Sequence, residues 1–113
     1  MHELALTEGI LKIVSSEQKK NAFARVLEID LKIGEYSGII PSCIREFVPL
    51  VAKDTPAEGA KLVMQTVPAE FECSVCGFHG PLPKHTANCP QCGGTQVRMI
   101  AGREFYVENL VVE

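Results

Sequence analysis

The chain has 113 residues, of which 46% are hydrophobic and 22% are charged, an ordinary composition for a small globular protein. Its net charge of −3 disfavours a nucleic-acid binder, because such proteins normally carry a basic surface. No apolar run approaches the ~18 residues of a membrane span, and the start of the chain lacks the basic region of a signal peptide. We therefore expect a cytoplasmic protein that binds neither nucleic acid nor membrane.

A change in hydrophobic period predicts the first two elements. From Glu3 to about Lys20, apolar residues recur at the spacing of a helix. These residues are Leu6, Ile10, Ile13 and Val14. The next segment, RVLEIDLKIG, alternates between apolar and charged residues, which predicts a strand that ends at Gly34. Its buried face should carry Leu27, Ile29, Leu31 and Ile33.

A second helix is predicted from about Pro41, since proline is tolerated in a first helical turn. Pro49 lies inside the helical pattern, so we expect a kink or an early end there. The apolar face of this helix should comprise Ile40, Ile44, Phe47, Val48 and Val51. A turn over residues 54–59 then leads to a second strand, KLVMQTV, which Pro68 closes.

Residues 71–100 differ from the rest, because they hold four cysteines and show no helical period. After them, REFYVENLVV has the composition of a third strand. This order predicts an α+β fold: a small three-stranded mixed sheet covered by two helices, with an inserted zinc-ribbon-like four-cysteine module. The first two strands should be parallel, with a right-handed crossover. We divide the chain into an α/β domain of residues 1–70 plus 101–113 and a metal-binding domain of residues 71–100.

The cysteine spacing predicts a metal site. Two CxxC pairs, Cys73 with Cys76 and Cys89 with Cys92, are separated by twelve residues. Two such turns can supply four thiolates in a tetrahedron, the geometry that zinc prefers, at Zn–S distances of about 2.3 Å. Four protein ligands leave no open position for a substrate, so the metal should be structural. It would contribute about 10 kcal/mol or more to the folding of a segment that has few large apolar residues.

Other chemistry remains open for these residues. A redox dithiol or two disulfides would use the same thiols, and iron also suits four thiolates. We expect His79 and His85 in solvated loops, with replacement of a thiolate or a response to pH as the alternative. Cys43 lies apart in the second helix, where we expect a small buried hydrophobic residue.

The first three residues, Met1, His2 and Glu3, contain a second set of metal donors. Methionine excision normally needs a small second residue, so Met1 should keep a free α-amine. That amine, the His2 amide nitrogen and the His2 imidazole can form fused chelate rings, and the Glu3 amide or carboxylate could complete four-coordination. A plane of ligands that includes an amide nitrogen favours Ni(II) or Cu(II). The amine and the imidazole must both be unprotonated, with reference pKa values of about 7.8 and 6.5, so binding should weaken in mild acid.

Three motifs together resemble the HypA/HybF family of hydrogenase nickel-insertion accessory proteins: MHE, IGEYSGIIPSCIREF, and FECSVCG with CPQCGG. The resemblance runs along the whole chain in the same order. It implies that His2 is the essential nickel ligand, with the Met1 amine and the Glu3 backbone as co-ligands. It also implies a fold similar to the one predicted above, and a structural zinc ion held by Cys73, Cys76, Cys89 and Cys92.

The resemblance further implies a nickel metallochaperone, not an enzyme, that delivers Ni(II) to the large subunit of a [NiFe] hydrogenase with a HypB-type GTPase as partner. Ligands at a chain end suit delivery, because an acceptor can displace them one at a time. The chain shows no GxxxxGK phosphate loop and no nucleophile–base set. Two rival interpretations are a zinc-ribbon adaptor without a functional second metal and a small electron carrier with iron on the thiolates. The chain is compatible with a monomer or a homodimer.

Overall fold

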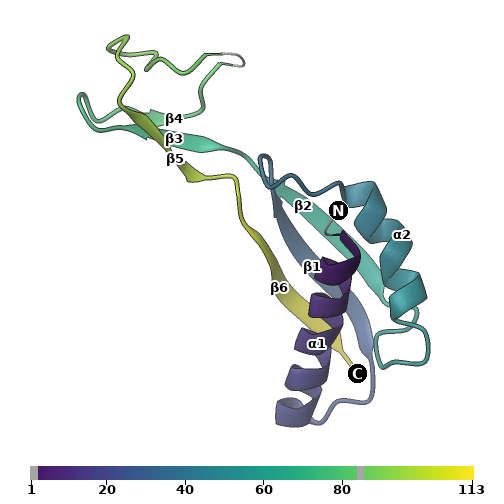
Figure 1. Cartoon of the computed structure of the whole chain (residues 1–113). Helices are drawn as coiled ribbons and strands as arrows, with labels where there is room; N and C mark the ends of the chain where they lie inside the picture. Colours follow the sequence, from purple (N-terminus) through teal and green to yellow (C-terminus); the bar gives the residue numbers. More distant parts are fainter. Residues whose placement is uncertain (1–2, 84–85) are drawn as a thin grey trace.

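The computed structural model describes residues 3–83 and 86–113. These residues form two small sheets joined end to end, and both helices pack on the first sheet (Figure 1). The elements are α1 (Glu3–Asn21), β1 (Val26–Gly34), α2 (Pro41–Val51), β2 (Lys61–Val67), β3 (Glu70–Cys73), β4 (His79–Gly80), β5 (Val97–Ala101) and β6 (Phe105–Val112). Neither helix in this part of the chain has the length and apolar character needed to cross a bilayer.

The first sheet confirms the predicted α+β fold. Its strand order is β2-β1-β6, in which the central strand β1 pairs parallel with β2 and antiparallel with β6. The α2 helix connects the two parallel strands, and β2 covers the predicted segment KLVMQTV. Pro49 lies inside α2, which ends two residues later at Val51. This is the early end predicted for a helix that loses a backbone donor.

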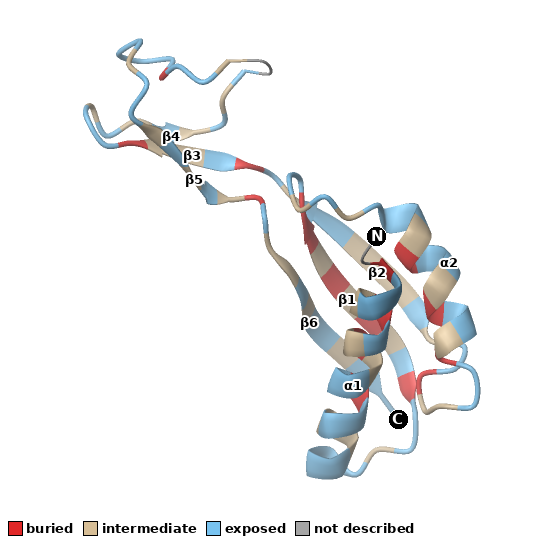
Figure 2. Ribbon diagram, viewed as in Figure 1, coloured by how far each residue is buried: buried red, intermediate tan, exposed pale blue. Residues whose placement is uncertain are grey.

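The core of the first sheet lies on the face that the helices cover (Figure 2). The α1 helix buries Ile10 and Val14, and α2 buries Ile44 and Val48, at the helical spacing read from the sequence. The central strand contributes Val26, Ile29 and Leu31. The buried core is aliphatic, so apolar burial is the main term that holds the two helices on the sheet.

Two predicted core positions are wrong. Leu27 is 40% exposed, and Val26 is buried instead. The pairing of β1 with β6 shifts between Val26 and Glu28, which marks a β-bulge, and the extra residue changes which side chains face the core. Ile40 is 55% exposed, because it is the N-cap residue of α2 and its extended backbone precedes the helical face.

The strands β3, β4 and β5 form a second sheet that we did not predict. Its order is β4-β3-β5, with antiparallel pairing on both sides of β3. The strands are only four, two and five residues long, too short to show a period in the sequence. The two joined sheets give a radius of gyration of 17.8 Å, whereas a compact domain of this length would have about 13 Å. The chain is therefore elongated.

The helix-free face of β1 carries a pair of carboxyl groups that should make stability depend on pH. A hydrogen bond with Asp30 raises the pKa of Glu28 above 4.5, burial and repulsion from Asp30 add to this, and Lys61 opposes it. Because the folded pKa is raised, the contribution of Glu28 is fully favourable below the unfolded pKa and is lost as the pH rises through the folded pKa. Glu28→Gln should therefore raise Tm at neutral pH and change it little at about pH 4.5. Thermal unfolding at both pH values tests this, with the exposed Glu46→Gln as control, and an equal shift at both would contradict it.

Candidate metal centres

The four predicted cysteines meet where β3 ends, at the end of the second sheet. The Sγ atoms of Cys73, Cys76, Cys89 and Cys92 all lie within 4.8 Å of one another. The Sγ–Sγ distance is 3.8 Å between Cys73 and Cys92 and 3.5 Å between Cys76 and Cys89. A tetrahedral ion with metal–sulfur bonds of about 2.3 Å needs sulfur atoms about 3.8 Å apart. The cluster therefore fits a single four-coordinate metal ion, and it contains no disulfide, since the Sγ atoms are too far apart to be bonded and all five cysteines are free.

Both CxxC pairs lie in the same kind of turn. In each, the N–H of the first cysteine donates to the carbonyl oxygen five residues later, at 2.9 Å in the first turn and 2.8 Å in the second. The glycine four residues after that cysteine donates its N–H back to the cysteine carbonyl, at 3.1 and 2.9 Å. These glycines, Gly77 and Gly93, have φ angles of +78° and +73°, which other residues adopt only with strain. The local sequence CxxCG thus forms the ligand turn twice.

The neighbouring amides and thiols make the four cysteines differ in acidity. Two backbone N–H groups of the first turn lower the pKa of Cys73. Burial raises the pKa of Cys89, but backbone N–H groups of the second turn and hydrogen bonds with two of the other thiols together lower that pKa to about 7. For Cys76, a backbone N–H lowers the pKa, whereas burial and hydrogen bonds with the other three thiols raise it to about 12. The Cys76 thiol therefore keeps its proton at neutral pH in the metal-free cluster, and a metal ion must release that proton.

The polypeptide around the cluster has almost no core of its own (Figure 2). Among the described residues of the range 71–100, only Cys73 and Cys89 are buried. Val75, between the first two cysteines, is 69% exposed. Apolar burial is the main favourable term in folding, so this region needs another source of stability. A metal ion held by four thiolates is such a source.

The other candidate donors that the structure describes, His79 and Cys43, do not belong to the cluster. His79 belongs to β4 instead of the expected loop, but it is exposed as expected, and its Nε2 lies 3.5 Å from Oε2 of Glu70. His85 lies outside the described residues. Cys43 lies on α2, which packs on the first sheet. Its side chain is half-buried, which is less than expected.

The N-terminal donor set is described only from its third residue, because Met1 and His2 lie outside the described residues. Glu3 opens α1 and is only 6% exposed, which is rare for a carboxylate. Its Oε2 accepts a hydrogen bond from the Ile40 N–H at 3.3 Å, and its carbonyl oxygen accepts one from the buried Thr7 hydroxyl at 2.8 Å. The Glu3 side chain therefore fixes the first turn of α1 against the start of α2. The sequence signal for this role was only an acidic residue in a first helical turn.

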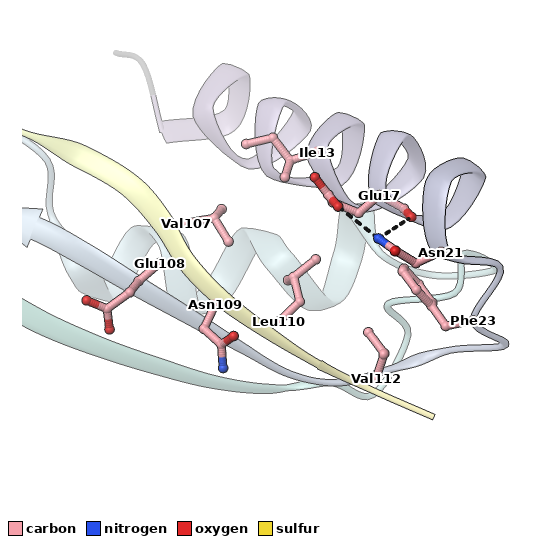
Figure 3. Close-up of a pocket in the computed structure, with 9 residues that line it drawn as sticks. All are labelled: Ile13, Glu17, Asn21, Phe23, Val107, Glu108, Asn109, Leu110 and Val112. Carbon is pink, nitrogen blue, oxygen red and sulfur yellow. Dashed lines mark hydrogen bonds between the residues drawn. The ribbon is translucent and has the colours of Figure 1, made fainter.

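A groove lies between α1 and β6, away from the thiolates (Figure 3). Its volume is about 310 Å³, and apolar side chains such as Ile13, Phe23 and Leu110 line much of it. Asn21 donates hydrogen bonds to the Glu17 carboxylate and carbonyl, at 3.2 and 3.4 Å (Figure 3). The described residues that line this groove include no thiol, so the groove is not part of the thiolate cluster.

The helix-covered mixed sheet, extended by a second sheet that ends in four convergent thiols, defines a small metal-binding protein with a separate thiolate module. The chain belongs to the HypA family: a family model described as "Hydrogenase/urease nickel incorporation, metallochaperone, hypA" matches residues 1–112. The family resemblance drawn from the three motifs is thereby confirmed. Membership makes the chain a nickel-incorporation metallochaperone of hydrogenase maturation at the level of the family.

Similar proteins cover the chain from end to end. The hydrogenase maturation factor HypA of Dehalococcoides mccartyi is 36% identical over 113 residues, which are 100% of this chain and 95% of that protein. The protein of the same name from Acidithiobacillus ferrooxidans is 38% identical over 100% of both chains. Among solved structures, "Solution structure of HypA protein" has a TM-score of 0.78 at 21% identity and covers 100% of this chain and 97% of its own. The Ni metallochaperone HypA from Helicobacter pylori has a TM-score of 0.74 at 21% identity, over 99% and 97%. These two structures confirm the fold.

Proposed function

We propose that this protein binds Ni(II) at its N-terminus and delivers it during maturation of a [NiFe] hydrogenase. The proposed ligands are the Met1 amine, the His2 amide nitrogen and imidazole, and Glu3. Family membership supports the nickel cargo. The structural observation that carries the site is the anchoring of Glu3, because the donors directly precede this buried residue, whose side chain accepts a hydrogen bond from the N-cap residue of α2.

The hydrogen bond of Glu3 also favours one of its two candidate donors. Its carboxylate already accepts the Ile40 N–H, and a metal ion would compete with that bond. We therefore assign the Glu3 contribution to its backbone amide, as the resemblance implies. A set of amine, amide and imidazole nitrogens favours a metal ion with square-planar coordination, such as Ni(II), over zinc, which prefers tetrahedral coordination.

We infer that the thiolate cluster holds a structural zinc ion. The sulfur separations fit metal–sulfur bonds of about 2.3 Å, and four protein ligands leave no open coordination position. Iron has the same ligand preference, and the two metals differ in visible absorption, because an iron–thiolate protein is coloured and a zinc protein is not. We propose that the cluster belongs to a zinc-binding domain of residues 71–100 and that residues 1–70 plus 101–113 form the nickel-binding domain.

The proposed role as a nickel carrier implies where the protein acts and which proteins it meets. We place the protein in the cytoplasm, with a HypB-type GTPase and the hydrogenase large subunit as partners. It acts as a carrier and not as an enzyme. A zinc-ribbon adaptor that uses no second metal is the rival function, and nickel binding at the N-terminus distinguishes the two.

Acetylation of the α-amine tests the nickel site directly. The acetyl group removes the amine ligand and leaves every side chain in place, so nickel affinity should fall by at least about tenfold, together with the planar Ni(II) absorption. Calorimetric titration of nickel into untagged, zinc-loaded protein, with and without enzymatic acetylation, provides the measurement. The unacetylated protein carried through the same procedure is the control. Equal affinity of the two forms would favour the adaptor.

A further inference from the structure

Two short crossings join the sheets: residues 68–69 between β2 and β3, and residues 102–104 between β5 and β6. The loop that follows β1 lies against both crossings (Figure 1). We define the neck as these two crossings together with Gly34, the last residue of β1, and loop residues 35–36. Its geometry determines how the thiolate cluster is oriented relative to the first sheet.

The loop forms hydrogen bonds with both crossings. The Glu35 N–H donates to the Val67 carbonyl at 2.8 Å, and the Glu35 carboxylate accepts the Ala69 N–H through Oε1, also at 2.8 Å. On the other crossing, the Tyr36 N–H donates to the Gly102 carbonyl at 2.7 Å. Two consecutive loop residues thus tie together the two segments that lead into the second sheet.

A second carboxylate stiffens the crossing at residues 102–104. Glu104 Oε1 accepts the Gly102 N–H at 2.5 Å, and the Glu104 carbonyl accepts the Gly34 N–H at 2.7 Å. The Glu104 side chain therefore bonds within its own crossing. The Glu35 side chain differs, because it reaches from the loop to a crossing that is remote in the sequence.

The backbones of the neck are in close contact. A Cβ on Gly34 would lie 2.2 Å from the Gly102 carbonyl oxygen, and a Cβ on Gly102 would lie 2.7 Å from the Ala69 Cα. Gly102 also has a φ of +119°, which favours glycine. Gly34, Ala69 and Gly102 are all buried. The crossings are therefore packed segments and not free linkers.

The same loop continues to the anchor of α1. The Ile39 N–H donates to the Ser37 hydroxyl oxygen at 3.2 Å, and the Ile40 N–H donates to the Glu3 carboxylate at 3.3 Å. The segment of residues 35–40 thus begins in the neck and ends at the hydrogen bond with the first turn of α1. The start of α1 lies at the end of the first sheet that is nearest the second sheet (Figure 1).

We propose that Glu35 is a positioning residue whose carboxylate locks the second sheet, and with it the thiolate cluster, to the loop that anchors α1. The cluster and the start of α1 then keep a fixed mutual orientation. The importance of this orientation for nickel transfer rests on the proposed function, but the lock itself does not. The acceptor atom, and not the negative charge, performs this role.

Amide exchange and residual dipolar couplings on zinc-loaded, full-length protein test the lock. In Glu35→Ala, exchange of the Ala69 amide should rise by about tenfold, since one hydrogen bond is lost. The Tyr36 and Ile40 amides should also exchange faster, and the two sheets should no longer share one alignment tensor. Glu35→Gln keeps an oxygen acceptor, so it should stay within about twofold of the wild type. Glu46→Ala, an exposed change on α2, is the matched control for loss of a carboxylate.

Three results would overturn the proposal. One is a single shared alignment tensor in Glu35→Ala, and another is Glu35→Gln behaving like Glu35→Ala. If Glu35→Ala fails to fold, Glu35→Asp replaces it, because the shorter side chain keeps the charge and withdraws the acceptor. The third overturning result is that Glu35→Asp shows the amide exchange rates and the shared alignment tensor of the wild type. The acetylation experiment decides the nickel site separately, so failure of either idea can be recognised on its own.

Discussion

Replacing Cys73 by alanine should release the metal from the thiolate cluster and unfold the second sheet, while the first sheet and its helices stay folded. The change removes one of four ligands and the larger part of the stabilisation that a structural metal supplies, about 10–16 kcal/mol in comparable zinc peptides. Only Cys73 and Cys89 are buried among the described residues of the range 71–100, so no apolar core can compensate. The first sheet keeps its aliphatic core around Ile29, Ile44 and Val48.

Metal content, amide exchange and far-UV circular dichroism measure this effect. Slow exchange should survive in β1 and α2 and disappear from β3 and β5. Cys43→Ala is the control, because it removes a thiol from α2 and leaves the cluster intact. Unfolding of the whole chain in Cys73→Ala would contradict the proposed division into two domains.

Replacing His2 by alanine should weaken Ni(II) binding by at least about 100-fold at pH 7.5. Changes that only disturb the support of a metal ligand already cost about 10–100-fold, and this one removes the imidazole itself. Wild-type affinity should fall as the pH drops through about 7.8 and 6.5, because the amine and the imidazole take up protons. In His2→Ala, nickel affinity should no longer fall around pH 6.5, because the imidazole that takes up a proton there is missing. Calorimetric titration across this pH range provides the measurement.

His79→Ala is the matched control for His2→Ala, because it removes an exposed imidazole that bonds only Glu70 among the described residues. It should leave nickel affinity unchanged. If His79→Ala weakens nickel binding and His2→Ala does not, the nickel site lies in the second sheet. In that case the proposed delivery from the chain end is wrong.

The amino-acid sequence alone determined the features that depend on local pattern. The 3.6-residue period of Ile10 and Val14 predicted α1, and the segment KLVMQTV predicted β2. The two CxxCG turns predicted a four-thiolate cluster, because both the ligands and the glycines that shape each turn lie within five residues. Three motifs in order were also enough to identify the family.

Only the tertiary structure decided the features that depend on pairing between distant segments. The bulge that exposes Leu27 arises where β1 meets β6, and the second sheet forms because β3 pairs with β4 and β5. The roles of Glu3 and Glu35 depend on partners 37 and 34 residues away. Hydrophobic period and ligand spacing describe neighbours along the chain, whereas a register shift or a buried carboxylate follows from which strands and loops the folded backbone brings together.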